Sequence, residues 1–165
     1  MKLQLFLILC VFIFLDLKAQ NPQLFQHDWR LESITTDTDS FIPSSSPDPN
    51  TGTFNYVLFY QQSGGVPFYF QFGVYGSVLG ENLIFSGNQS FDISLITLLL
   101  GESSIAADYM VNNFLYEDQT NNLIYNPFSY DFRYENNLIY LDISNSVGSV
   151  ATFYDNFLSQ DNFLK

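Results

Sequence analysis

The chain has 165 residues, enough for one domain with a hydrophobic core, and its 17 acidic and 5 basic residues give a net charge of −12. So few cations exclude a nucleic-acid partner, because affinity for nucleic acids depends on Lys and Arg that neutralise phosphates. The same charge disfavours docking on anionic lipid. With 18 Phe and 11 Tyr, we expect an aromatic core.

The N-terminal residues 1–19 have the pattern of a secretory signal peptide. Lys2 precedes an apolar run over residues 3–15, and Ala19 supplies a small residue before a cleavage point. The run is shorter than the roughly 20 residues that a membrane-spanning helix needs. We therefore expect the mature chain to be exported to the periplasm, the cell surface or the extracellular space.

The chain has one cysteine, Cys10, and it lies in the middle of this apolar run. A lipoprotein signal would place its cysteine at the cleavage point, so we do not expect a lipid anchor. Removal of the signal peptide leaves no thiol, which excludes a disulfide, a thiolate nucleophile and a cysteine-based metal site in the mature protein.

After the signal peptide, period-two alternation of apolar and polar residues predicts half-buried strands. In chain order, the predicted strands are residues 28–35, 54–61, 67–76, 82–85, 90–99, 128–135, 138–144 and 149–155. In the third strand Phe68, Phe70 and Phe72 share one face, which we expect to point inwards. In residues 128–135 apolar and charged side chains alternate, as in an antiparallel sheet with one solvated face.

One helix is predicted near residues 103–117. Ser103 or Ser104 can cap its first turn, and Ala106, Met110 and Phe114 recur every four residues. We expect these apolar side chains to pack on the sheet. The alternative, in which Met110 belongs to a ligand box, stays open at this point.

The connections follow from turn chemistry. Three prolines and a serine triplet predict a long loop over residues 35–53, because proline cannot donate to a strand ladder. Asn136 and Asn137 predict a tight hairpin, since asparagine tolerates the left-handed backbone conformation. Residues 156–165 form a tail with two Phe-Leu pairs, which we expect to pack back or to add to a sheet edge.

No catalytic constellation is visible, so we do not expect an enzyme. His27 is the one histidine and no Gly-x-Ser-x-Gly motif is present, which favours a structural role for this side chain. Asp131 and Glu135 would lie about 13 Å apart on one strand at about 3.3 Å per residue. Glycoside hydrolysis needs carboxyl groups about 5–9.5 Å apart, so this pair is better explained as surface charge around Arg133.

We expect no metal and no cofactor. Asp37 and Asp39 resemble the start of a calcium loop, but Ile42 occupies the sixth position, where that loop requires glycine. Patterns for zinc, for a phosphate-binding loop and for a dinucleotide are absent from the sequence.

Three loose motifs give the chain a familiar appearance. They are Trp29-x-Leu31-x-x-Ile34, Leu83-x-Phe85-x-Gly87-x-x-x-Phe91 and Gly148-x-x-Ala151-x-Phe153-Tyr154. Together they resemble small exported lipocalin-like or META-like β domains of bacteria. The resemblance covers most of residues 28–155, and it implies an exported β-barrel. It transfers no catalytic residue, because the motifs are packing positions.

These observations predict an all-β fold, with one domain over residues 20–165. We expect a lipocalin-like antiparallel barrel of about eight strands with one short helix. The first functional hypothesis is a non-enzymatic module that binds a small apolar or aromatic ligand in the barrel mouth, with Tyr69, Gln71 and Tyr75 as polar groups. The alternative is a filled barrel that acts as a structural or interaction module, with another envelope protein as its partner.

An outer-membrane barrel is the architectural rival. Its strands need about 9–11 residues with an apolar outer face, and several predicted strands are shorter. We therefore expect a chain that is not inserted in a membrane.

Overall fold

The computed structural model describes residues 21–43, 56–61, 67–73, 78–87, 89–98, 104–117 and 123–156. The strands are β1 (Trp29–Thr35), β2 (Ser40–Phe41), β3 (Tyr56–Gln61), β4 (Phe68–Phe72), β5 (Val78–Ser86), β6 (Ser90–Asp92), β7 (Leu95–Leu98), β8 (Phe128–Glu135), β9 (Leu138–Ser144) and β10 (Val150–Asn156). The helices are the 3-10 helix η1 (Pro22–Phe25), the α-helix α2 (Ile105–Met110) and the π-helix η3 (Val111–Leu115).

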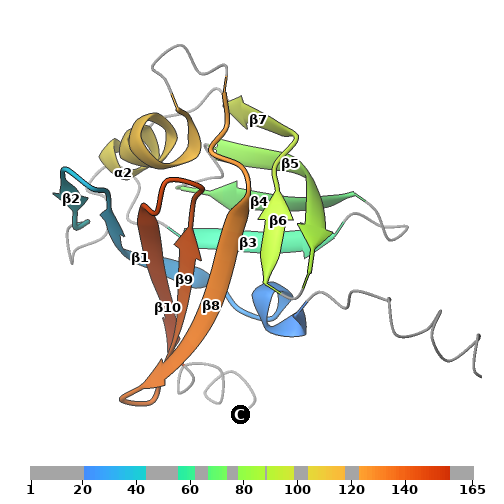
Figure 1. The fold of residues 1–165 in the computed structure, drawn as a ribbon. Helices are drawn as coiled ribbons and strands as arrows, with labels where there is room; N and C mark the ends of the chain where they lie inside the picture. Colours follow the sequence, from blue (N-terminus) through green and yellow to red (C-terminus); the bar gives the residue numbers. More distant parts are fainter. Residues whose placement is uncertain are drawn as a thin grey trace, which may run out of the picture.

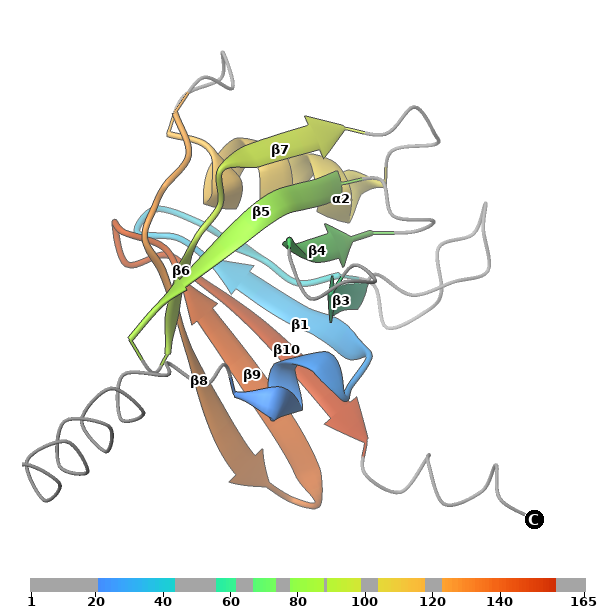
Figure 2. The same ribbon diagram turned by 90° about the vertical axis from the view of Figure 1, so that its right-hand side faces the viewer.

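Eight of the strands close into an antiparallel barrel. Their order is β1-β10-β9-β8-β6-β5-β4-β3, and β3 pairs with β1 to complete the ring. β2 and β7 lie outside the ring on β1 and β5. Figures 1 and 2 show α2 toward one end of the barrel and η1, in blue, toward the other. The predicted barrel of about eight strands with one short helix is confirmed.

Aromatic rings fill the barrel. Phe68, Phe70 and Phe72 of β4 are buried, as predicted from their alternation, and the residues between them are half-buried on the outer face. Phe91 and Phe128 stack at the β6–β8 joint with ring centroids 5.6 Å apart. Each such burial contributes about 1.5–3 kcal/mol, so the rings supply the stability that the chain lacks from disulfides.

Gly80 leaves room for one of these rings, that of Phe70. It lies directly opposite Phe70 in the β4–β5 ladder. A Cβ atom at Gly80 would lie 2.0 Å from Cε1 of Phe70, so the ring packs directly on the glycine backbone. This glycine also explains why β5 starts at Val78 and not at residue 82, the predicted start. Glycine is rare in strands and interrupts the apolar pattern.

The predicted strand 90–99 is wrong as one element, because it breaks between β6 and β7. β6 pairs with β8, and this ladder ends at the pair of Phe91 and Phe128. The Asn126 side chain pairs instead with the backbone of Ile93: Ile93 N donates to Oδ1 and Nδ2 donates to the Ile93 carbonyl, each at 2.8 Å. Beyond this point β7 follows β5 alone.

The predicted helix is confirmed in place, although its second half is a π-helix. Ser104 caps it, with its hydroxyl accepting from Ala107 N at 3.1 Å. Tyr116 N donates to Val111 O at 3.3 Å, which closes a five-residue turn and ends the helix. The apolar side chains of Met110 and Phe114 are buried, which confirms the expectation that this face packs on the sheet.

Turns behave as their residues predict. Asn136 and Asn137 have φ of 52° and 64° and join β8 to β9 in a tight hairpin. Within the predicted loop 35–53, residues 40 and 41 form the short β2. The Thr36 hydroxyl accepts from Asp39 N at 3.0 Å and turns the chain back on β1. The rest of that loop after residue 43 lies outside the described residues.

Replacing Gly80 by alanine tests the contact with Phe70. The added methyl forces the buried ring from its place, and we expect Gly80→Ala to lower the free energy of unfolding by about 1–3 kcal/mol in denaturant titration. In a Phe70→Leu background the same change should cost clearly less, because the shorter side chain leaves room. An equal cost in both backgrounds would contradict the packing described.

Asn126→Ala tests the side-chain pairing with Ile93. The change leaves one part-buried donor and one acceptor unsatisfied, so we expect a loss of about 1–3 kcal/mol and faster hydrogen exchange of the Ile93 amide. Asn113→Ala is the control, because that exposed side chain bonds only to its own helix, at Tyr109 O. Unchanged exchange at Ile93 in Asn126→Ala would rule out the pairing.

Candidate functional site

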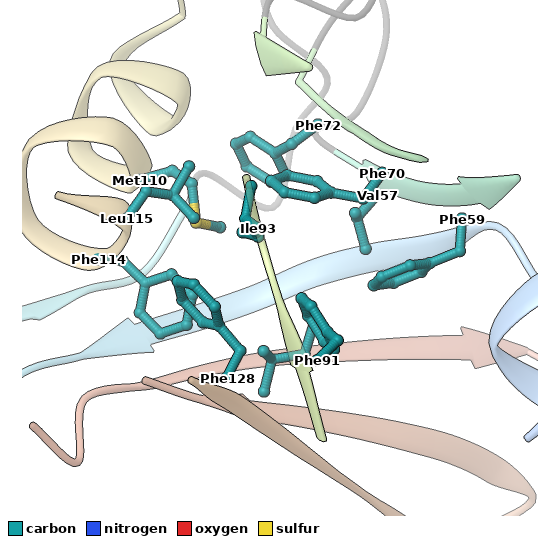
Figure 3. Close-up of a pocket in the computed structure, with 11 residues that line it drawn as sticks. Val57, Phe59, Phe70, Phe72, Phe91, Ile93, Met110, Phe114, Leu115 and Phe128 are labelled. Carbon is teal, nitrogen blue, oxygen red and sulfur yellow. The ribbon is translucent and has the colours of Figure 1, made fainter. Parts of the chain in front are cut away.

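The barrel interior leaves almost no free space. In the described part of the chain, a cavity of about 20 Å³ lies between aromatic and aliphatic side chains of the strands and the helices (Figure 3). Its lining residues are Val57, Phe59, Phe70, Phe72, Phe91, Ile93, Met110, Phe114, Leu115, Phe128 and Ile143. Small-molecule pockets occupy about 300–1,000 Å³, so this cavity is a packing gap. Hollows of ligand size lie at the surface.

The first such hollow, which we name the mouth groove, lies between η1 and the strands β3 and β4. It has a volume of about 440 Å³ and is lined by Pro22, Phe25, Gln26, Phe59, Tyr60, Gln61 and Phe68. The rings of Phe59 and Phe68 are 5% and 8% exposed and form an apolar floor. Phe25 packs beside them, with ring centroids 6.4 and 5.5 Å away.

The short helix η1 holds one wall of the mouth groove in place. Asn21 caps this helix by accepting from Gln23 N at 3.0 Å, and Pro22 suits its first turn because proline needs no donor there. The Trp29 indole donates to Leu24 O at 3.1 Å, which fixes the helix to the start of β1. The wall is therefore rigid relative to the barrel.

Of the three predicted ligand groups, Tyr69 lies beside the mouth groove. Tyr69 and Gln71 are on the outer face of β4, and Tyr75 lies outside the described residues. Tyr69 stacks on Tyr60, which lines the groove, with ring centroids 5.3 Å apart and planes 13° from parallel. Gln71 lies opposite Leu58 and does not line the groove. The alternation of side chains in the sequence predicted that these residues share one face of the strand. It did not reveal the mouth groove, which Tyr60 lines.

Tyr60 is neutral at physiological pH. Burial raises the pKa of its phenol, and the neighbouring Tyr69 and Glu81 raise it further because each disfavours a second negative charge. The wall of the groove thus presents a ring and a hydroxyl that can both donate and accept.

A second hollow, which we name the polar groove, lies near α2. It has a volume of about 360 Å³ and is lined by Thr36, Asp37, Thr38, Asn112, Asn113, Tyr116, Glu117, Tyr125, Val147 and Ser149. Sequence reasoning missed this groove, because its residues come from four separate segments. The one feature of the sequence that could have indicated this groove is the adjacent pair of Asn112 and Asn113 in the predicted helix.

His27 forms a largely buried pair with Asp155. Its Nδ1 lies 2.6 Å from Oδ2 of Asp155, and its ring packs on Trp29 at 5.0 Å between centroids. The side chains are 9% and 13% exposed. The pair joins the segment before β1 to the end of β10. It therefore adds a side-chain contact to the backbone pairing of these two strands.

The carboxylates of β8 belong to a surface network. Arg133 binds Asp142 through Nε at 2.5 Å and Glu135 through Nη1 at 2.7 Å, and its guanidinium lies over the Tyr140 ring. The hydrogen bond with Asp142 raises the pKa of Arg133. Asp131 accepts from Gln89 Nε2 at 3.1 Å. Each carboxylate thus has a partner on the sheet surface.

Within the described residues, no group of three His, Cys, Asp or Glu side chains could hold a metal ion. None of the described helices is long and apolar enough to cross a membrane. Comparison of the chain with protein-family models, with curated proteins and with solved structures finds no match.

The pair of His27 and Asp155 can be tested through stability. We expect His27→Ala to lower the free energy of unfolding by about 1–3 kcal/mol, because Asp155 is left largely buried without this partner. Glu135→Ala is the control: its carboxylate is 54% exposed, and an exposed ion pair contributes about 0–1 kcal/mol. Equal losses in the two variants would show that the buried pair does not join β1 to β10.

Proposed function

We propose that the chain is an exported, non-enzymatic β-barrel protein that binds a small apolar or aromatic ligand in the mouth groove. The observation that carries this proposal is the groove itself, about 440 Å³ in volume, with an apolar aromatic floor and a polar rim. Ligand sites are typically concave and mainly apolar, with a few polar groups that orient the ligand.

The arrangement of the rings favours a planar ligand. Phe59 and Phe68 form the floor, and the rings of Phe25 and Tyr60 also line the groove. Aromatic pairs prefer offset-stacked or edge-to-face contacts at 4.5–7 Å between centroids, and a flat ring in the groove can form both. Because Tyr60 is already stacked on Tyr69, little side-chain entropy is lost when a ligand packs on it.

The charge of the protein favours a neutral or cationic ligand over an anionic one. The chain has a net charge of −12, and Glu81 lies close enough to Tyr60 to raise the pKa of its phenol. Gln26 and Gln61 at the rim offer amide donors and acceptors without charge. A neutral aromatic compound satisfies all of these groups.

Export and the lipocalin-like or META-like resemblance support the same proposal from the sequence. The N-terminal residues 1–19 have the charge, length and small-residue pattern of a signal peptide. A barrel with a covered mouth is an architecture in which small ligands are commonly bound at the rim.

The second candidate is a filled barrel that acts only through protein contacts, with an envelope protein as its partner. The small volume of the interior cavity, about 20 Å³, favours this candidate. It predicts no affinity for small apolar compounds, whereas the mouth-groove proposal predicts it, so one binding experiment separates the two.

Titration with Nile red, a neutral apolar dye, provides that experiment. We expect saturable fluorescence enhancement with the full chain, and we expect Tyr60→Ala to weaken the affinity about tenfold because one wall of the groove is lost. Native mass spectrometry of the protein purified from cells that export it should then reveal a bound aromatic compound.

Tyr109→Ala is the matched control, because this tyrosine stacks on Phe41 beside α2 and does not line the mouth groove. Its affinity for the dye should equal that of the unchanged chain. No saturable binding, or equal weakening in both tyrosine variants, would refute the mouth groove as a ligand site and favour the filled interaction module.

A further inference from the structure

The polar groove is assembled from segments far apart in the sequence. The turn after β1 supplies Asp37 and Thr38, the start of the π-helix supplies Asn112, and the segment before β8 supplies Tyr125. The turn between β9 and β10 supplies Ser149. Figure 1 shows these elements together around α2, on the far side of the barrel from η1.

Hydrogen bonds fix the two turns that border the polar groove. The Thr36 hydroxyl accepts from the backbone N–H of Asp39 at 3.0 Å and donates to its carbonyl at 3.2 Å. In the other turn, Oδ1 of Asn145 accepts from Val147 N at 3.2 Å and from Ser149 N at 2.9 Å. Both borders are thus held in one conformation by their own side chains.

Further hydrogen bonds join the borders to the helices. Nδ2 of Asn145 donates to Phe114 O at 3.0 Å, which ties the β9–β10 turn to the π-helix. The Tyr109 hydroxyl donates to Oδ2 of Asp39 at 3.3 Å, which ties the first turn to α2. The groove is therefore preorganised, and a ligand would not have to order it on binding.

Several polar side chains at the rim of the polar groove take no part in these hydrogen bonds. The side chains of Asp37, Thr38, Asn112 and Glu117 make no hydrogen bond to another described residue and are exposed to solvent. Asn112 and Asn113 belong to the π-helix. Single π-turns occur frequently at functional sites.

The lining excludes several classes of ligand. Among the described residues, no Lys, Arg or His lines the polar groove, so this lining has no group to neutralise an anion. The absence of a three-residue metal cluster from the described residues also disfavours a metal ion. Hydroxyl, amide and carboxylate groups outnumber apolar ones, so a purely apolar compound would leave them unsatisfied.

We propose that the polar groove binds a neutral saccharide. Each sugar hydroxyl both donates and accepts, and the amides of Asn112 and Asn113 do the same, while Asp37 and Glu117 accept. The ring of Tyr125 offers an apolar face for the C–H side of a sugar ring. A cationic amine would use only the acceptors and would leave the amide donors unpaired.

This inference does not depend on the proposed function. The polar groove and the mouth groove share no lining residue, so either can be lost without the other. It adds a second ligand class, which an exported protein meets on cell surfaces.

An array of neutral and charged glycans, followed by calorimetric titration of the strongest neutral binder, tests the inference on the full chain. We expect binding to neutral glycans, weakened about tenfold by Asn112→Ala and about fivefold by Glu117→Gln. Both side chains are exposed, so thermal melting should be unchanged. Gln26→Ala, in the mouth groove, should bind like the unchanged chain.

Asp37→Asn separates a saccharide from an amine. The amide oxygen still accepts from a hydroxyl, so glycan affinity should fall by no more than a few-fold, whereas affinity for an amine such as spermidine would be lost. The inference is overturned if no neutral glycan binds, if only charged glycans bind, if spermidine displaces the glycan, or if Asn112→Ala and Glu117→Gln leave the affinity unchanged.

Discussion

The pairing of the Asn126 side chain with the backbone of Ile93 decides how this barrel is completed. The backbone ladder between β6 and β8 ends at Phe91 and Phe128, and the buried peptide groups of Ile93 beyond it need other partners. The Asn126 side chain makes the two hydrogen bonds that one further pair of backbone residues would have made. The chain can therefore leave β8 after β6, and β7 pairs with β5. The Tyr116 hydroxyl, at the end of η3, then donates to Ile96 O on β7. The polar groove lies beside these helices.

The interior imposes the second constraint. The aromatic rings stack on one another, and Phe70 packs directly on the backbone of Gly80. This packing leaves a cavity of about 20 Å³ in the interior. A close-packed interior resists both expansion and collapse, so a small compound cannot enter without removing side chains. The two grooves of ligand size in the described part of the chain lie outside this packed interior, beside helices and turns. The position of both grooves follows from the packing of the core.

Local patterns in the sequence predicted those parts of the fold that local chemistry decides. The bounds of β8 and β9, the inward face of β4, the Ser104 cap and the Asn136–Asn137 hairpin each depend on residues close in sequence. The break between β6 and β7 depends on Asn126, more than thirty residues away, and no periodicity reveals it. The grooves escaped prediction for the same reason, since each is built from separate segments. Alternation placed Tyr69 on a face but could not show that its partner Tyr60 borders a hollow.

The few cations of the chain support the proposal of uncharged ligands for both grooves. Arg133 and Arg30 each lie over a tyrosine ring of a neighbouring strand, Tyr140 and Tyr154, and these four residues follow one another across β8, β9, β10 and β1. The arginines thus contribute to cohesion of the outer sheet face and lie away from both grooves. An acidic chain that engages its arginines in this way offers anions no favourable place near either groove. In both proposals, selectivity therefore comes from shape, from ring stacking at the mouth groove and from hydrogen bonds at the polar groove.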